Sequence, residues 1–307
     1  MKILVTGGSG MVGSYIKKIA PEHHKWVFIS SKEFDLTNPY AMDTVIQIHK
    51  PDAIIHLAAL VGGLFKNMRE KVKMFHDNVL INENVLHYAN KYNIQYVICC
   101  ASTCVYPANP PNFPMTEEMI MCGVPHPSNN AYAYAKRMMV MQCQNYNNEF
   151  GRKYICVTPC NLYGKYDNFN LDDAHVVPAL IHKFYNASKK NEKLVIPTGN
   201  DTMRQFVYAK DFAKIILRVL DNIDNMKLNN VIVCNDEVKI TDIISQIAKS
   251  FPNVDYEIIE KEEGITKKTC SNELLLSTFP DVEFSDFDHK LKKTIDWFIH
   301  NYNDVRK

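Results

Sequence analysis

The chain has 307 residues, of which 46% are hydrophobic and 22% charged, and these values are ordinary for a globular protein with a sizeable core. Its 35 Lys and Arg residues nearly balance its 34 Asp and Glu residues, so a net charge of +1 excludes a bulk attraction to nucleic acid or anionic membrane. No apolar run reaches the roughly 18 residues of a membrane span, which argues against a membrane protein.

Strand-like and helix-like patterns alternate along the first half of the chain. Short apolar runs predict five strands, and the segments between them carry apolar residues at helical spacing. A capping side chain and a proline at Asn38-Pro39 predict a helix that ends before Pro51. The predicted strands are Lys2–Thr6, Trp26–Ser30, Ala53–Leu57, Tyr96–Ala101 and Tyr154–Thr158, and the other predicted helices are Met11–Ala20, Phe75–Asn93 and Tyr132–Phe150.

After Gly164 the alternation is less regular. Apolar strands separated by helix-length segments indicate a parallel sheet covered on both faces. We therefore predict an α/β fold with a doubly wound parallel sheet in residues 1–164, joined by 203–235, and a smaller C-terminal α/β substrate lobe in 165–202 and 236–307. The later helices are expected at Val176–Ala187, Asp211–Leu220, Ile240–Phe251 and His289–Tyr302, and the strands at Leu194–Ile196, Asn230–Val233 and Tyr256–Ile259.

A glycine cluster directly follows the first predicted strand. Residues 7–13 read GGSGMVG, which satisfies both GxGxxG and GxxGxxG, and the first predicted helix begins inside it. Glycine permits a tight turn, lets the backbone approach a pyrophosphate and seats the helix N-terminus against that anion. We therefore predict a Rossmann-type dinucleotide site whose loop comprises Gly7, Gly8, Ser9, Gly10, Met11, Val12 and Gly13.

The end of the second predicted strand indicates which dinucleotide binds. A site specific for NAD normally has an acidic residue there, which binds the adenosine ribose. This chain has Ser30-Ser31-Lys32, with no carboxylate before Glu33. Hydroxyls and an ammonium suit a 2′-phosphate, so the pattern favours NADP(H), although a solvated surface lysine is the simpler interpretation of Lys32.

Tyr132 and Lys136 form a YxxxK pair on a predicted helix. Residues four apart share a helix face, so the ammonium of Lys136 is expected to lower the pKa of the Tyr132 phenol and make it an acid/base for a carbonyl. Ser102 follows the fourth predicted strand, where ligands of parallel sheets bind, and can hydrogen-bond the same oxygen. An amphipathic helix and a strand cap are the ordinary alternatives, but the three motifs in this order are more specific than each alone.

In this combination the chain resembles the extended short-chain dehydrogenase/reductases. Within them it resembles the branch that epimerises C3 and C5 and reduces C4 of GDP-4-keto-6-deoxy-D-mannose to give GDP-L-fucose. The resemblance runs from Met1 nearly to Lys307. It is carried by TGGSGMVGS at the glycine loop, STCVYP at 102–107, NNAYAYAKRM at 129–138, PCNLYGKYDNFN at 159–170, HVVPALIHK at 175–183 and MRQFVYAKD at 203–211.

The resemblance implies a chemical role for five residues. Tyr132 would protonate the C4 oxygen as NADPH delivers hydride, while Lys136 tunes it and Ser102 supports the same oxygen. Cys104 and His175 would be the acid/base pair for C3 and C5, since protons next to a ketone are acidic and inversion needs groups on opposite faces. A buried apolar cysteine and a surface histidine at a helix start are the ordinary alternatives.

The resemblance also implies the binding residues. Arg204 and Lys183 match positions that bind the diphosphate, for which a guanidinium is well suited. The Lys267-Lys268-Thr269 segment is a weaker nucleotide candidate, and Ile196-Pro197 stands where bacterial members have a tryptophan. Besides the glycine loop, the implied cofactor contacts are Ser31, Lys32, Asp35, Leu36, Leu57, Ala58, Ala59, Lys136, Pro159, Asn161, Leu162 and His175, and the substrate contacts are Asn161, Lys183, Arg204 and Lys267.

Two other functions fit parts of the pattern. A sugar-nucleotide 4-epimerase with tightly held NAD shares the serine and the YxxxK pair. Such an enzyme needs neither Cys104 nor His175, and it normally has an acidic residue near the position of Lys32. A nucleotide-sensing regulatory protein would keep the fold and lose the Tyr or Lys of YxxxK. Both therefore rank below the reductase.

The remaining expectations concern partners and compartment. Members of the resembled branch are homodimers built through a helix bundle, which the helices Phe75–Asn93 and Tyr132–Phe150 can supply. Nine cysteines without a Cys-x-x-Cys pair, and no signal peptide before the glycine cluster, predict a reduced cytoplasmic protein with no bound metal. The expected partner is a GDP-sugar substrate, with no nucleic acid and no membrane.

Overall fold

Six parallel strands form the main sheet of the computed structural model, which describes residues 1–199, 202–226, 228–260 and 268–307. Every pairing in this sheet is parallel, and the chain order reverses between β1 and β3, the kind of switch point where doubly wound sheets bind ligands. The predicted Rossmann-type α/β fold is confirmed. In sheet order the strands are β2 (Lys25–Phe28), β1 (Lys2–Thr6), β3 (Ala53–His56), β4 (Tyr96–Cys100), β5 (Lys153–Pro159) and β9 (Asn230–Val233).

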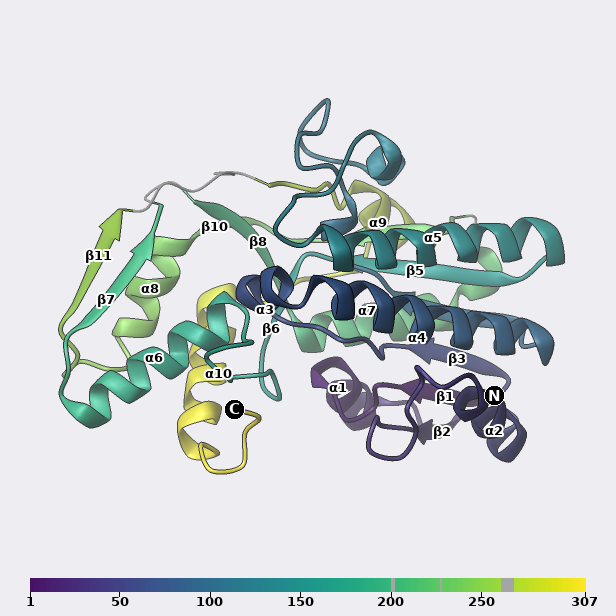
Figure 1. Cartoon of the computed structure of the whole chain (residues 1–307), viewed down its shortest axis with the longest axis horizontal. Coiled ribbons are helices and arrows are strands. Elements are labelled where there is room, and N and C mark those ends of the chain that lie inside the picture. The colour runs from purple at the N-terminus through teal and green to yellow at the C-terminus, as the bar shows by residue number, and fades with distance from the viewer. Residues whose placement is uncertain (200–201, 227, 261–267) are drawn as a thin grey trace.

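Helices cover both faces of this sheet (Figure 1). Successive strand residues point to opposite faces, so Leu4 packs in one buried cluster with Met42, whereas Ile3 packs in another with Phe212. The first cluster lies under α2 (Pro39–His49), α4 (Lys71–Lys91) and α5 (Asn130–Phe150), and the second lies under α1 (Met11–Ile19) and α7 (Ala209–Asp221).

A smaller lobe lies beside the main sheet, at the left of Figure 1. It contains a three-stranded sheet in the order β10-β8-β6 and a parallel pair of β11 and β7. Its strands are β6 (Asn161–Tyr163), β7 (Leu194–Thr198), β8 (Met203–Tyr208), β10 (Glu237–Lys239) and β11 (Tyr256–Glu260), and its helices are α6 (Val176–Lys190), α8 (Ile240–Ala248) and α10 (Phe287–His300).

Residues 203–235 divide between the two sheets. β9 is the last strand of the main sheet and α7 packs on one of its faces, whereas β8 pairs with β6 and β10 in the smaller sheet and so departs from the predicted division. One buried cluster continues from α1 and α7 into the lobe, where it includes Phe206 and Phe298. We therefore propose that the domain boundary lies between β8 and α7, and that the two parts share a core.

Local signals in the sequence explain both ends of α2. The Asn38 side chain accepts a hydrogen bond from the Tyr40 N–H at 3.0 Å, Pro39 opens α2, and the helix ends before Pro51 as predicted. Among the described residues, no helix has both the length and the apolar character needed to cross a membrane. Elements that the sequence did not predict are β6, β8, β10, α3 (Leu64–Arg69), α9 (Glu273–Thr278) and the 3₁₀ turns Thr103–Val105, Glu117–Met121 and Ile223–Asn225.

Candidate active site

The parallel register brings the ends of four strands to one edge of the main sheet. Thr6 pairs with His56, which pairs with Cys99, and Cys100 pairs with Val157. The loops after these strands carry the glycine cluster, residues 57–59, residues 101–104 and residues 160–162. Each of these segments was predicted on its own to follow a strand. The parallel register brings all of them to one edge of the sheet.

The glycine loop fits a dinucleotide pyrophosphate. Gly7 has φ +67°, and a Cβ there would lie 2.8 Å from the Ala58 nitrogen. A Cβ on Gly13 would lie 2.6 Å from the Gly7 carbonyl oxygen. Gly10 caps α1 without any side-chain hydrogen bond, so the first N–H groups of the helix remain for an anion. The backbone of the loop therefore packs so closely at Gly7 and Gly13 that any side chain there would displace it.

Substituting Gly7 by alanine is expected to weaken NADPH binding by at least about tenfold, because the new Cβ would push Ala58 away from the glycine loop. Fluorescence titration with NADPH measures the change. Gly151→Ala is the matched control, since Gly151 also has a positive φ of +64° but has nothing within 4 Å of its Cβ position. Equal NADPH affinity in both variants would contradict this prediction.

The adenosine end of the predicted site contains two carboxylates that are engaged locally. Glu33 accepts from the Ser30 N–H at 2.9 Å and from its Oγ at 2.7 Å, and these bonds lower the pKa of Glu33. Asp35 accepts from the Thr37 hydroxyl and N–H, which lowers its pKa. Ser31 and Lys32 are exposed beside them. This arrangement suits a 2′-phosphate better than a free ribose.

Three further implied cofactor residues, Leu57, Ala58 and Ala59, are half-buried beside the glycine loop. A buried polar chain that sequence reasoning missed supports them. The Thr6 hydroxyl lies 2.8 Å from His56 Nδ1 and accepts from the Ala58 N–H at 3.2 Å, and His56 Nε2 lies 3.1 Å from the Asn82 amide oxygen. Burial lowers the pKa of His56 to about 4, so its imidazole is neutral.

Tyr132 and Lys136 lie one turn apart near the start of α5, and both are buried. The ammonium of Lys136 lies 6.0 Å from the centre of the Tyr132 ring and donates to the Cys100 carbonyl at 2.8 Å. Burial, and then the thiols of Cys104 and Cys100, raise the pKa of Tyr132 well above its usual value. The predicted lowering by Lys136 is therefore wrong for this structure, since desolvation outweighs an ammonium that is directed at a carbonyl.

Ser102 and Cys104 lie together in the turn after β4. The Ser102 Oγ accepts from the Cys104 N–H at 3.3 Å. Burial raises the pKa of the Cys104 thiol, while Ser102 and the ammonium groups of Lys268 and Lys136 oppose that rise. At neutral pH Cys104 is therefore a thiol surrounded by groups that favour its thiolate.

His175 belongs to the smaller lobe, where it is the capping residue of α6. The residue is exposed, and desolvation by nearby protein atoms lowers the pKa of its imidazole. The imidazole is therefore neutral near pH 7 and can accept a proton. Cys104, in the turn after β4, and Tyr132, on α5, belong in contrast to the part of the molecule built on the main sheet.

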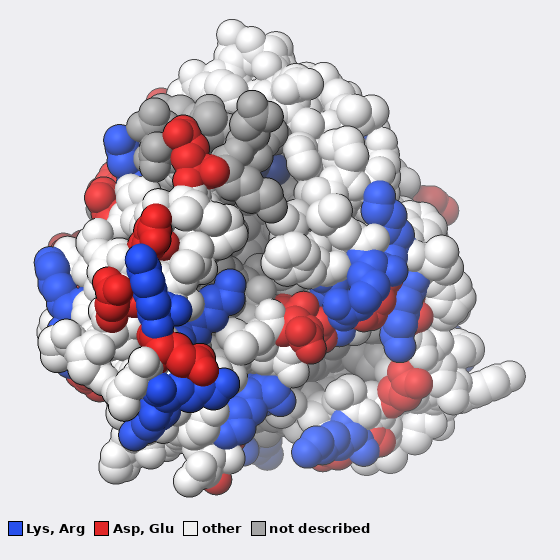
Figure 2. Space-filling model, turned by 60° about the vertical axis from the view of Figure 1, so that its left-hand side comes forward, with Lys and Arg blue, Asp and Glu red and all other residues white. Residues whose placement is uncertain are grey.

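Cationic side chains gather between the two parts of the molecule. Burial lowers the pKa of Lys268, and Arg204 and Arg137 lower it further, so these three cations lie near one another and near Cys104. Sequence reasoning missed His126, whose pKa is lowered by burial and then by Lys268 and Arg204. Figure 2 shows one face of the molecule, which is hollowed along its middle and has Lys and Arg side chains on both sides of the hollow.

The other predicted binding residues lie on neighbouring elements. Asn161 donates its side-chain N–H to the Gln205 carbonyl at 2.9 Å, which joins β6 to β8. Arg204 is half-buried on β8, and Lys183 is half-buried on α6. Pro159 ends β5, Leu162 lies in β6, and the Leu36 carbonyl accepts from Asn84 at 2.8 Å. The predicted substrate residue Lys267 lies outside the described residues.

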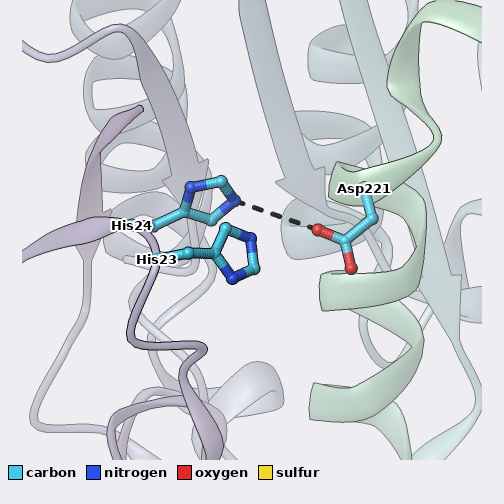
Figure 3. A group of neighbouring side chains, drawn as sticks. All are labelled: His23, His24 and Asp221. Carbon is cyan, nitrogen blue, oxygen red and sulfur yellow. Dashed lines mark ion pairs between the residues drawn. The ribbon is translucent and has the colours of Figure 1, made fainter.

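One group of metal-capable side chains occurs in the described ranges, at His23, His24 and Asp221 (Figure 3). It lies between the start of β2 and the end of α7, at the sheet edge opposite the strand ends. His24 Nε2 is 3.9 Å from Asp221 Oδ1, and the two imidazole centres are 4.0 Å apart. The contact between His24 and Asp221 and the ring contact between the two imidazoles account for this arrangement, and we assign no metal to it.

Known proteins are similar to this chain in sequence and in structure. The sequence pattern of the NAD dependent epimerase/dehydratase family matches residues 3–234. The chain is similar to a GDP-L-fucose synthase of Dictyostelium discoideum, at 41% identity over 99% of this chain and 97% of that protein. It is similar to a probable GDP-L-fucose synthase of Drosophila melanogaster, at 38% identity over 100% and 99%.

A solved structure is similar over the whole chain. The crystal structure of a GDP-L-fucose synthetase from Naegleria fowleri bound to NADP matches with a TM-score of 0.91. The two sequences are 36% identical, and the match covers 100% of this chain and 95% of the other.

Proposed function

The chain belongs to the NAD dependent epimerase/dehydratase family, and we propose that it is an NADP(H)-dependent enzyme that converts GDP-4-keto-6-deoxy-D-mannose to GDP-L-fucose. It epimerises C3 and C5 and reduces C4. The observation that carries this proposal is Cys104, an acid/base group that a simple ketone reductase does not need, in the turn beside Ser102 and next to the buried Tyr132 and Lys136. The names of its relatives support the same reaction.

Reduction at C4 needs a proton donor beside the carbonyl oxygen. The raised pKa of Tyr132 keeps its phenol protonated at neutral pH, which is the state that an acid requires. Ser102 can donate a second hydrogen bond to the same oxygen, and Lys136 holds the strand end through the Cys100 carbonyl. NADPH, when bound, supplies the hydride.

Epimerisation uses the other pair. The C4 ketone acidifies the protons on C3 and C5, so a base can remove each proton and an acid can return one on the opposite face. Cys104 lies on the main-sheet side and His175 on the lobe side, which suits groups that work from opposite faces. Arg204, Lys183 and Lys268 provide positive charge for the diphosphate.

The first test incubates the purified protein with GDP-4-keto-6-deoxy-D-mannose and follows cofactor absorbance, separately with NADPH and NADH. NADPH should be oxidised faster than NADH, and the product should be GDP-L-fucose and not GDP-rhamnose. Oxidation of NADPH that yields only GDP-rhamnose would show that the protein reduces C4 without epimerising C3 and C5. No oxidation with either cofactor would overturn it, and a 4-epimerase with bound NAD would be tested next.

We also propose that the protein is a cytoplasmic homodimer. Apolar side chains are exposed along α3 and the start of α4, and Val72 is 84% and Phe65 65% exposed. A second copy would cover such a surface through α4 and α5. All nine cysteines are free, which suits a reducing compartment. Sedimentation equilibrium should give a mass about twice the 35.3 kDa of one chain.

A further inference from the structure

The segment that leads to His175 is held by one carboxylate. Lys66 Nζ donates to Asp173 Oδ2 at 2.6 Å, and Arg69 donates to Asp173 Oδ1 at 3.0 Å. Both cations belong to α3, which the sequence did not predict. The Asp173 side chain is 24% exposed, so solvent screens these ion pairs only in part. Lys66, and then Arg69, hold the pKa of Asp173 below its usual value.

The backbone of the same segment is fixed as well. The Gly63 N–H donates to the Asp173 carbonyl at 2.7 Å, and the Ala174 N–H donates to the Asn170 carbonyl at 2.7 Å. A Cβ on Gly63 would lie 2.1 Å from the Ala174 carbonyl oxygen, so only glycine permits this approach. The residue after Ala174 is His175, whose extended backbone begins α6.

These contacts join the two sides of the site. Gly63 and α3 follow β3 and the cofactor-side residues 57–59, whereas Asp173 belongs to the loop that enters the smaller lobe. α3 is itself fixed, because the buried Asn67 side chain donates to the Gly62 carbonyl at 2.7 Å. The carboxylate of Asp173 is paired with Lys66 and Arg69, so what it can supply to His175, two residues later, is a fixed backbone.

We propose that Asp173, held by Lys66, Arg69 and the Gly63 N–H, is a positioning residue for epimerisation. It fixes the start of α6, and with it the place of His175 relative to the sugar and Cys104. This inference rests on the proposed function. Tyr132, Lys136 and Ser102 lie on α5 and in the turn after β4, apart from the Asp173 segment, so a loosened Asp173 should slow epimerisation and spare hydride transfer.

Two assays separate these steps in Asp173→Asn. Epimerisation is followed without cofactor as deuterium uptake from D₂O at C3 and C5 of GDP-4-keto-6-deoxy-D-mannose. Hydride transfer is followed in reverse as the initial rate of GDP-L-fucose oxidation by NADP⁺. Deuterium uptake should fall about tenfold because a catalytic group is displaced, and GDP-L-fucose oxidation should stay within about twofold of the wild type.

The control is Asp43→Asn. Asp43 accepts from Lys91 at 2.8 Å and is 22% exposed, but it joins α2 to α4 away from the strand ends. The Asp43→Asn substitution should leave deuterium uptake and GDP-L-fucose oxidation unchanged. Gly63→Ala is a second variant, which should give the Asp173→Asn pattern by pushing the Ala174 carbonyl without altering charge.

The outcomes keep the two proposals apart. If the wild type shows no deuterium uptake, the proposed function fails. If the wild type takes up deuterium and both Asp173→Asn and Gly63→Ala match it, the positioning role is wrong. It is also wrong if deuterium uptake and GDP-L-fucose oxidation fall equally in these variants, because that result indicates general loss of structure.

Discussion

Replacing Tyr132 by phenylalanine should slow C4 reduction by about a thousandfold, because the carbonyl oxygen then has no acid to protonate it. Deuterium uptake at C3 and C5 should continue within a few-fold of the wild-type rate, since Cys104 and His175 carry that step in our proposal. NADPH oxidation measures the first rate, and mass spectrometry of the nucleotide sugar in D₂O measures the second.

The chain offers a closely matched control two residues away. Tyr134 lies on the same helix but is 39% exposed, whereas Tyr132 is 9% exposed. Tyr134→Phe also removes one phenolic hydroxyl, and this variant should reduce C4 at the wild-type rate. If both variants lose reduction equally, or if Tyr132→Phe reduces normally, Tyr132 is not the proton donor.

The raised pKa of Tyr132 also sets the pH dependence of this step. An acid whose pKa lies well above its usual value of about 10 stays protonated through the neutral range. The reduction rate should therefore not fall between about pH 6 and about pH 9 on account of Tyr132. A Tyr132 pKa lowered by Lys136 would instead give a falling rate within that range.

The sequence predicted the main sheet well because strands such as β1 and β3 are buried on both faces. Lys2–Thr6 and Asn230–Val233 have the predicted bounds, since each contains an uninterrupted apolar run, Ile3–Val5 in the first and Val231–Val233 in the second. The short strands were missed for a different reason. β6 has three residues and exists only because it pairs with β8, about forty residues later, which local pattern does not reveal. α3 exposes Leu64 and Phe65, so it lacks an apolar face directed at the core.

The candidate site was predictable to the extent that it depends on strand ends. The glycine loop and Ser102 follow strands, and the parallel register then brings them to one edge. The electrostatics were not predictable in the same way. The pKa of Tyr132 depends on burial and on where the Lys136 ammonium points, and neither follows from a spacing of four. The ion pair of Lys66 and Asp173 spans 107 residues, beyond any local motif.

The second large effect is expected from Cys104→Ser, which should slow deuterium uptake at C3 and C5 by about a hundredfold or more. A hydroxyl is a much weaker acid than a thiol, so serine cannot exchange protons with carbon at the same rate. The change is nearly isosteric, and the Ser102 Oγ accepts from the backbone N–H of residue 104, which the substitution retains. The fold around the site should therefore persist.

Oxidation of GDP-L-fucose by NADP⁺ should remain within a few-fold of the wild-type rate in Cys104→Ser, because that step uses Tyr132 and not the thiol. Cys122→Ser is the control, since Cys122 is free and exposed and should leave both rates unchanged. Loss of both steps in Cys104→Ser would show that the cysteine supports the structure, and normal deuterium uptake would show that another group moves the protons. Opposite losses in Tyr132→Phe and Cys104→Ser would mean that one sheet edge carries two separable reactions, since each variant then keeps the step that the other lacks.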